Sequence, residues 1–80
     1  MYKYQRIEDL REDHDLKQDA LAHLLGTTKQ QYSLWERGER EFPFHNVIKL
    51  ALYFNVTIDY LAGLINEPKP LREEKREEKQ

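Results

Sequence analysis

The placement of glycine and proline constrains this 80-residue chain most strongly. These residues divide it into short segments, at Gly26, Gly38, Pro43, Gly63, Pro68 and Pro70. None of the segments shows the sustained two-residue alternation that is typical of a half-buried strand. Several instead carry apolar residues at three- and four-residue spacing, which is typical of an amphipathic helix. The sequence therefore predicts an all-α fold of five short helices.

The first three helices are located by apolar stripes and by signals at their ends. The first stripe comprises Tyr4, Ile7 and Leu10 and ends near His14. The second comprises Leu21, Leu24 and Leu25, in a segment that begins near Gln18. Gly26 directly follows the second stripe, where a left-handed residue commonly ends a helix. Thr28 and Gln31 match the capping-box pattern, which predicts a third helix between Thr28 and Gly38.

The last two helices are predicted in the same way. Pro43 is expected at the first position of a fourth helix, with an inner face made of Phe44, Val47, Ile48, Ala51 and Phe54. Asn55 is expected to end it in a left-handed conformation, and Thr57 to cap a fifth helix. The stripe of that helix comprises Ile58, Leu61 and Ile65. Because Pro68 and Pro70 follow, we expect a folded domain at 1–66 and a charged, flexible tail at 67–80.

The segment from Gln18 to Trp35 has the spacing of a helix-turn-helix. Two helices that cross at about 90–120° through a short turn require a small residue at their contact and a glycine in the turn. Ala22 and Gly26 meet these requirements. Tyr32 and Trp35 are expected to anchor the second helix, which leaves a polar face exposed at Lys29, Gln30, Ser33 and Arg37. On a groove-reading helix, such side chains can bond to adenine or guanine edges.

Three blocks of this sequence resemble the Cro/phage-repressor (Xre-type) helix-turn-helix family of transcriptional regulators. They run from Arg6 to Gly26, through Trp35-Glu-Arg-Gly-Glu-Arg40, and through Asn55-Val-Thr-Ile-Asp-Tyr-Leu-Ala-Gly63. The resemblance covers residues 4 to about 65. It implies a five-helix, phage-repressor-like DNA-binding domain, in which the third helix enters the major groove of a double-stranded DNA operator. It also implies a bacterial or phage transcriptional regulator, such as a repressor, that acts as a homodimer.

The resemblance further assigns roles to individual residues. It implies base or nearby phosphate contacts for Thr28, Lys29, Gln30 and Ser33, a thymine-methyl contact for Leu34, and phosphate contacts for Gln18, Arg37 and Arg40. It implies a structural ion pair between Arg11 and Glu36. Lys17 departs from the usual Ser or Thr cap, and we interpret it as a further phosphate contact. Two alternatives stay open: an ordinary solvated helix face, and surface pairing of Arg37 and Arg40 with Glu39 and Glu41.

The overall charge of the chain is slightly negative, which does not by itself favour DNA binding. The formal net charge is −2, and residues 1–68 carry 8 basic and 11 acidic side chains. Because non-specific DNA binding depends on positive charge, a DNA-binding role requires a locally basic surface. The alternative is a protein-interaction module on the same scaffold, such as an antitoxin with an unidentified protein partner.

An enzyme is not expected from this sequence. No nucleophile–base arrangement, metal-ligand set or phosphate-cradling loop is visible, and no cofactor or metal is predicted. The chain has no cysteine, and its histidines lack ligand spacing. The acidic group Asp13, Asp15 and Asp19 is interpreted as a helix end followed by partners of a helix dipole.

The remaining predictions concern location, assembly and the tail. The longest mainly apolar stretch, from Val47 to Phe54, is too short to cross a bilayer. No apolar signal segment is seen at the N-terminus, so a cytoplasmic location is expected. The apolar residues Leu52, Tyr53, Leu64 and Ile65 are predicted to form a two-fold interface. In residues 72–79, like charges recur every four residues, which predicts a frayed tail.

Overall fold

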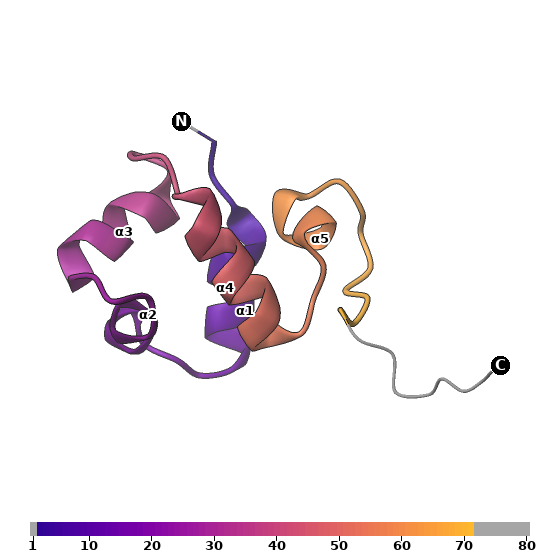
Figure 1. The fold of residues 1–80 in the computed structure, drawn as a ribbon, viewed down its shortest axis with the longest axis horizontal. Helices are drawn as coiled ribbons and strands as arrows, with labels where there is room; N and C mark the ends of the chain where they lie inside the picture. Colours follow the sequence, from indigo (N-terminus) through magenta and orange to yellow (C-terminus); the bar gives the residue numbers. More distant parts are fainter. Residues whose placement is uncertain (1, 72–80) are drawn as a thin grey trace, which may run out of the picture.

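The computed structural model describes residues 2–71, and all regular elements in this range are helices (Figure 1). In chain order they are α1 (Gln5–Asp13), α2 (Gln18–Leu25), α3 (Lys29–Arg37), α4 (Phe44–Phe54) and α5 (Ile58–Ala62). The predicted all-α fold with five helices is therefore confirmed for the described residues. The charge repeat at 72–79 lies outside them. Between residues 2 and 71, no helix has the length and apolar character that a membrane span requires.

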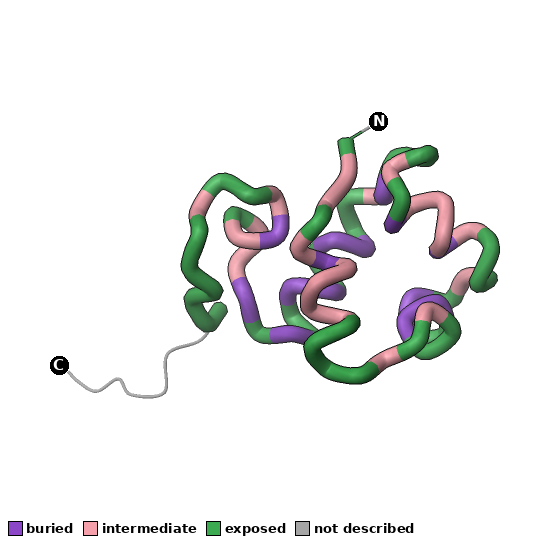
Figure 2. The backbone as a smooth tube through the Cα atoms, turned by 180° about the vertical axis from the view of Figure 1, so that it is seen from behind, coloured by how far each residue is buried: buried purple, intermediate pink, exposed green. Residues whose placement is uncertain are grey.

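The helices enclose one apolar core. Figure 1 shows α1 and α4 between the α2–α3 pair on one side and α5 on the other. Buried positions gather where the helices face one another, and the connecting segments are mostly exposed (Figure 2). The core comprises Ile7, Leu21, Ala22, Leu25, Tyr32, Phe42, Val47, Leu50, Ala51, Phe54, Val56 and Leu61.

Phe42 is a core residue that the sequence analysis missed. It is 2% exposed although it lies in the irregular segment between α3 and α4. Its ring centroid lies 5.9 Å from that of Tyr4, 5.9 Å from that of Tyr32 and 5.4 Å from that of Trp35. Phe42 therefore anchors two aromatic side chains of α3, and Trp35 packs against the core as predicted.

The caps predicted at Thr28 and Thr57 and the helix stops predicted at Gly26, Gly38 and Asn55 agree with the structure. Thr28 Oγ1 accepts a hydrogen bond from the Gln31 backbone N–H, and Thr57 Oγ1 accepts one from that of Tyr60, each at 3.1 Å. Left-handed residues end α2, α3, α4 and α5, at Gly26, Gly38, Asn55 and Gly63. Local sequence signals thus determine where α3 begins and ends.

Gly26→Ala should lower the free energy of unfolding by about 1–2 kcal/mol, because a left-handed backbone is unfavourable for a residue with a Cβ atom. Gly26 has a φ of +71°, and a Cβ added there would meet no atom within 4 Å. The loss should therefore come from the backbone alone. Urea unfolding of Gly26→Ala beside Gly26→Asn measures it, since asparagine tolerates this conformation better. Equal stability of the alanine variant and the wild type would contradict the prediction.

The inner face predicted for α4 is wrong at two positions. Phe44 is 61% exposed and Ile48 is 38% exposed, whereas Leu50 is fully buried. The buried apolar stripe of this helix is Val47, Leu50, Ala51 and Phe54. Because α4 is apolar on more than one side, periodicity alone did not distinguish two adjacent stripes. The helix also begins one residue later than predicted, with Pro43 as its N-cap.

After α5, the chain still forms hydrogen bonds with α1 and with the residue that ends α4. The Arg6 guanidinium of α1 donates to the carbonyl oxygens of Tyr60 and Ile65, at 3.1 and 2.7 Å, and lies 4.3 Å from the Tyr60 ring centroid. The fifth helix ends at Ala62, so Ile65 lies outside it and not on its stripe. The Leu71 backbone N–H donates to the Asn55 carbonyl oxygen at 3.3 Å. The boundary at residue 66 stays a prediction.

Candidate nucleic-acid interface

A tight turn joins α2 to α3. The Gly26 N–H donates to the His23 carbonyl oxygen at 3.1 Å, and the Thr27 N–H donates to that of Ala22 at 2.9 Å. This pair of bonds is the Schellman arrangement, which needs a left-handed residue at the position of Gly26. Thr28 then caps α3. The two helices are thereby joined in the helix-turn-helix arrangement that the spacing predicts.

The inner face of α3 is fixed by a buried carboxylate. Glu36 is 2% exposed. Its Oε2 accepts from Arg11 Nε and from the Tyr32 hydroxyl, each at 2.8 Å. Its Oε1 accepts from Arg11 Nη2 at 3.1 Å and from Gln18 Nε2 at 2.7 Å. The Arg11–Glu36 pair therefore links α1 to α3, and Gln18 adds a bond from α2.

This network also sets the ionisation of its members. Burial alone would raise the pKa of Glu36, but the hydrogen bonds from Arg11, Gln18 and Tyr32 and the Arg11 charge together lower it. Burial, followed by the negative charge of Glu36, raises the pKa of Tyr32. The hydrogen bond to Glu36 raises the pKa of Arg11. At neutral pH, α3 is therefore held by an ionised pair and a neutral phenol.

The lowered pKa of Glu36 predicts a loss of stability in acid. A carboxyl whose folded-state pKa lies below its ordinary value of 4.5 stabilises the fold fully above that value. The contribution is lost as the pH falls through the lower folded-state pKa. We therefore expect the stability difference between wild type and Glu36→Gln to be largest at pH 7 and to shrink in strong acid. Denaturant titrations of both proteins at several pH values measure it, and a pH-independent difference would contradict it.

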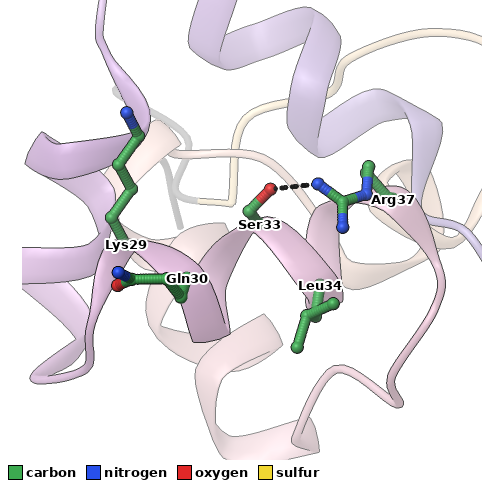
Figure 3. A pocket seen from close by; sticks show the side chains of 5 residues that line it. All are labelled: Lys29, Gln30, Ser33, Leu34 and Arg37. Carbon is green, nitrogen blue, oxygen red and sulfur yellow. Dashed lines mark hydrogen bonds between the residues drawn. The ribbon is translucent and has the colours of Figure 1, made fainter.

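The opposite face of α3 is open to solvent. Five of its side chains line a surface depression, drawn in Figure 3: Lys29, Gln30, Ser33, Leu34 and Arg37. A second depression is lined by Arg11, Lys17, Gln18, Asp19 and Lys29. Because Lys29 lines both, the predicted contact residues of α2 and α3 lie on neighbouring parts of one surface, which we call the α2–α3 face.

The predicted contact residues differ in exposure. The exposed ones are Lys17, Thr28, Lys29, Gln30, Arg37 and Arg40. Ser33 and Leu34 are half-buried, as is Gln18, whose amide donates to Glu36. The surface-pairing alternative holds for Arg37, which forms an ion pair with Glu39 at 3.0 Å. Among the described residues, no such pair is formed by Arg40.

Lys3 contributes to the site without having been predicted. Its Nζ donates to the backbone carbonyl oxygen of Glu36 at 3.0 Å and to Glu8 Oε1 at 2.8 Å. It thereby ties the segment before α1 to the last turn of α3. No local pattern marks this lysine, because its partner lies 33 positions away in the sequence.

Comparison with known proteins decides what this geometry represents. A family model described as Helix-turn-helix matches residues 7–61. The chain belongs to the helix-turn-helix family. The helix-turn-helix match runs from α1 to α5 and so includes the whole α2–α3 face and the buried network behind it.

Two curated relatives are similar to this helix-turn-helix chain. An uncharacterized HTH-type transcriptional regulator, YobD of Bacillus subtilis (strain 168), is 34% identical over 71 residues, which are 89% of this chain and 63% of the relative. The cryptic phage CTXphi transcriptional repressor RstR of Vibrio cholerae is 34% identical over 58 residues, which are 72% of this chain and 52% of the relative. The chain thus spans between half and two thirds of their lengths. No solved structure gave a significant match.

Proposed function

We propose that this protein is a sequence-specific, double-stranded DNA-binding transcriptional regulator of bacterial or phage type, and that it catalyses no reaction. The observation that carries the proposal is the two-sided character of α3. Its inner face is fixed by Tyr32 and Glu36, which are 0% and 2% exposed, while Lys29 and Gln30 are exposed on its outer face. The helix-turn-helix family and the names of both relatives support this function.

In the proposed complex, the N-terminal part of α3 enters the major groove. Gln30 can bond to adenine N6 and N7, Lys29 to guanine O6 and N7, and Leu34 can contact a thymine methyl group. Phosphate contacts that fix register without reading sequence are proposed for the remaining residues of the α2–α3 face and its flanks. These are Lys17, Gln18, Thr28, Ser33, Arg37 and Arg40.

Selection of bound duplexes from a random pool tests the function. An enriched motif that becomes less defined for Lys29→Ala and Gln30→Ala would support it. Binding should also weaken steeply as the salt concentration rises, because phosphate contacts release counterions. Recovery of no motif, together with a stable protein complex from cells, would favour the protein-interaction module instead.

Lys17→Ser should stabilise the fold and weaken DNA binding at the same time. Lys17 has the extended N-cap conformation of Thr28, with φ of −89° against −90°, but makes no side-chain cap bond. A serine there should raise the free energy of unfolding by about 1 kcal/mol. Loss of one phosphate contact should reduce the magnitude of the log–log salt slope by about 0.9. Thermal unfolding and binding at several salt concentrations measure the two effects, and an unchanged slope would count against the phosphate contact.

We also propose that the protein binds its operator as a homodimer, in the cytoplasm where such DNA lies. Apolar side chains outside the core support a two-fold interface near the C-terminal helices, since Leu52 is 54% exposed, Tyr53 50% and Leu64 75%. Symmetric helix-turn-helix dimers bind half-sites about 34 Å apart. Analytical ultracentrifugation with and without a two-site duplex tests the assembly, and a monomer in both conditions would exclude it.

A further inference from the structure

Arg37, which lines the α2–α3 face, forms an exposed ion pair with Glu39. Arg37 Nε donates to Glu39 Oε2 at 3.0 Å, and Arg37 Nη2 donates to Glu39 Oε1 at 3.2 Å. One edge of the guanidinium thus bonds both carboxylate oxygens. Its remaining nitrogen, Nη1, donates to Ser33 Oγ at 2.7 Å (Figure 3).

The backbone holds Glu39 in this place. Gly38 ends α3 with a φ of +79°, and its N–H donates to the Trp35 carbonyl oxygen at 3.1 Å. The Glu39 N–H then donates to the Leu34 carbonyl oxygen at 2.9 Å. These backbone bonds hold the main chain of Glu39 beside the last turn of α3, two residues after Arg37, so that its side chain can reach the guanidinium.

A DNA phosphate would bind the same edge of Arg37. Phosphate and carboxylate both accept parallel hydrogen bonds from an arginine fork, with similar geometry and the same sign of charge. The side chains of Arg37 and Glu39 are 53% and 57% exposed, so solvent and an incoming anion can reach the pair. The pair also keeps both members charged, since it raises the pKa of Arg37 and lowers that of Glu39.

We propose that Glu39 is an internal competitor of DNA, whose carboxylate occupies the phosphate-binding edge of Arg37 in the free protein. Binding of a duplex then exchanges one anion for another at Arg37, and the hydrogen bond to Ser33 is free to rearrange with it. Glu39 thereby weakens binding to every sequence by a similar factor. This inference rests on the proposed DNA-binding function and adds a residue that tunes its affinity.

A double-mutant cycle tests the competition. Fluorescence anisotropy would measure binding of wild type, Glu39→Gln, Arg37→Ala and the double variant to the selected duplex and to a scrambled one. Glu41→Gln is the matched control, because it removes one exposed negative charge from the same loop and makes no ion pair among the described residues. Glu39→Gln should tighten binding to both duplexes about three- to fivefold relative to that control.

The cycle separates the competing explanations. In the Arg37→Ala background, Glu39→Gln should have no more effect than Glu41→Gln has in the wild type. The inference is overturned if Glu39→Gln equals Glu41→Gln, or if its effect persists without Arg37, because either result reduces Glu39 to general charge repulsion. Failure of the wild type and all variants to bind either duplex would instead reject the proposed function, and the inference with it.

Discussion

Replacing Glu36 with glutamine is expected to lower the free energy of unfolding by about 3–5 kcal/mol, the range seen when one partner of a buried ion pair is removed. Glu36 is 2% exposed and accepts hydrogen bonds from Arg11, Gln18 and Tyr32. A glutamine keeps the shape but presents an amide NH2 group where donors converge, and it leaves the Arg11 charge without its partner. Domains of this size have about 4–12 kcal/mol of stability in total, so the loss is a large fraction.

Glu12→Gln is the matched control for this variant. Glu12 lies 3.9 Å from the same arginine, but its side chain is 61% exposed. Exposed pairs contribute at most about 1 kcal/mol. Urea unfolding of the three proteins at pH 7 gives the comparison. If Glu36→Gln were no more destabilising than Glu12→Gln, the buried network would not be what holds α3 in place.

The second large effect is expected on DNA recognition. Gln30→Ala should weaken binding to the selected duplex by about 1–3 kcal/mol, the discrimination of one good bidentate base contact, which is about 5- to 150-fold in Kd. Lys29→Ala should act similarly. Binding to a scrambled duplex should fall much less for Gln30→Ala, because an uncharged side chain contributes little to phosphate attraction.

Lys49→Ala is the charge-matched control for Lys29→Ala. Lys49 is exposed on α4 and lines neither depression of the α2–α3 face. Its removal should change binding to the selected and scrambled duplexes by the same small factor. Equal losses on the two duplexes for Gln30→Ala and Lys29→Ala would contradict the assignment of base-reading roles to these residues.

The helix ends were the most predictable part of this structure. Gly26, Thr28, Asn55 and Thr57 act through bonds to residues a few positions away, so the local sequence determines them. The exposure of Lys29 and Gln30 was predictable for a related reason. Once Tyr32 and Trp35 face inward, the helical repeat fixes which side chains face outward.

Features that depend on distant contacts were not predictable in the same way. The inner stripe of α4 depends on which side meets the other helices, and a sequence that is apolar on both sides does not decide this. Phe42 belongs to no periodic stripe, because it lies between helices. For Arg37, the sequence was compatible with both a surface ion pair and a phosphate contact. The structure shows the ion pair, because the chain turns after Gly38 so that Glu39 reaches the guanidinium.

Helix α1 carries two arginines that bond to opposite sides of the molecule. In α1, Arg6 bonds the carbonyl oxygens of residues 60 and 65, and Arg11 bonds Glu36 of α3. Helix α1 thus links α3 to the chain around α5, beside the apolar surface at the C-terminal helices. In a two-fold assembly through that surface, the distance between the two α3 helices would already be fixed in the free dimer. Such a dimer would bind only operators whose half-site spacing matches this fixed distance. Displacing one half-site by one base pair should weaken binding, because no hinge would let the two domains adjust.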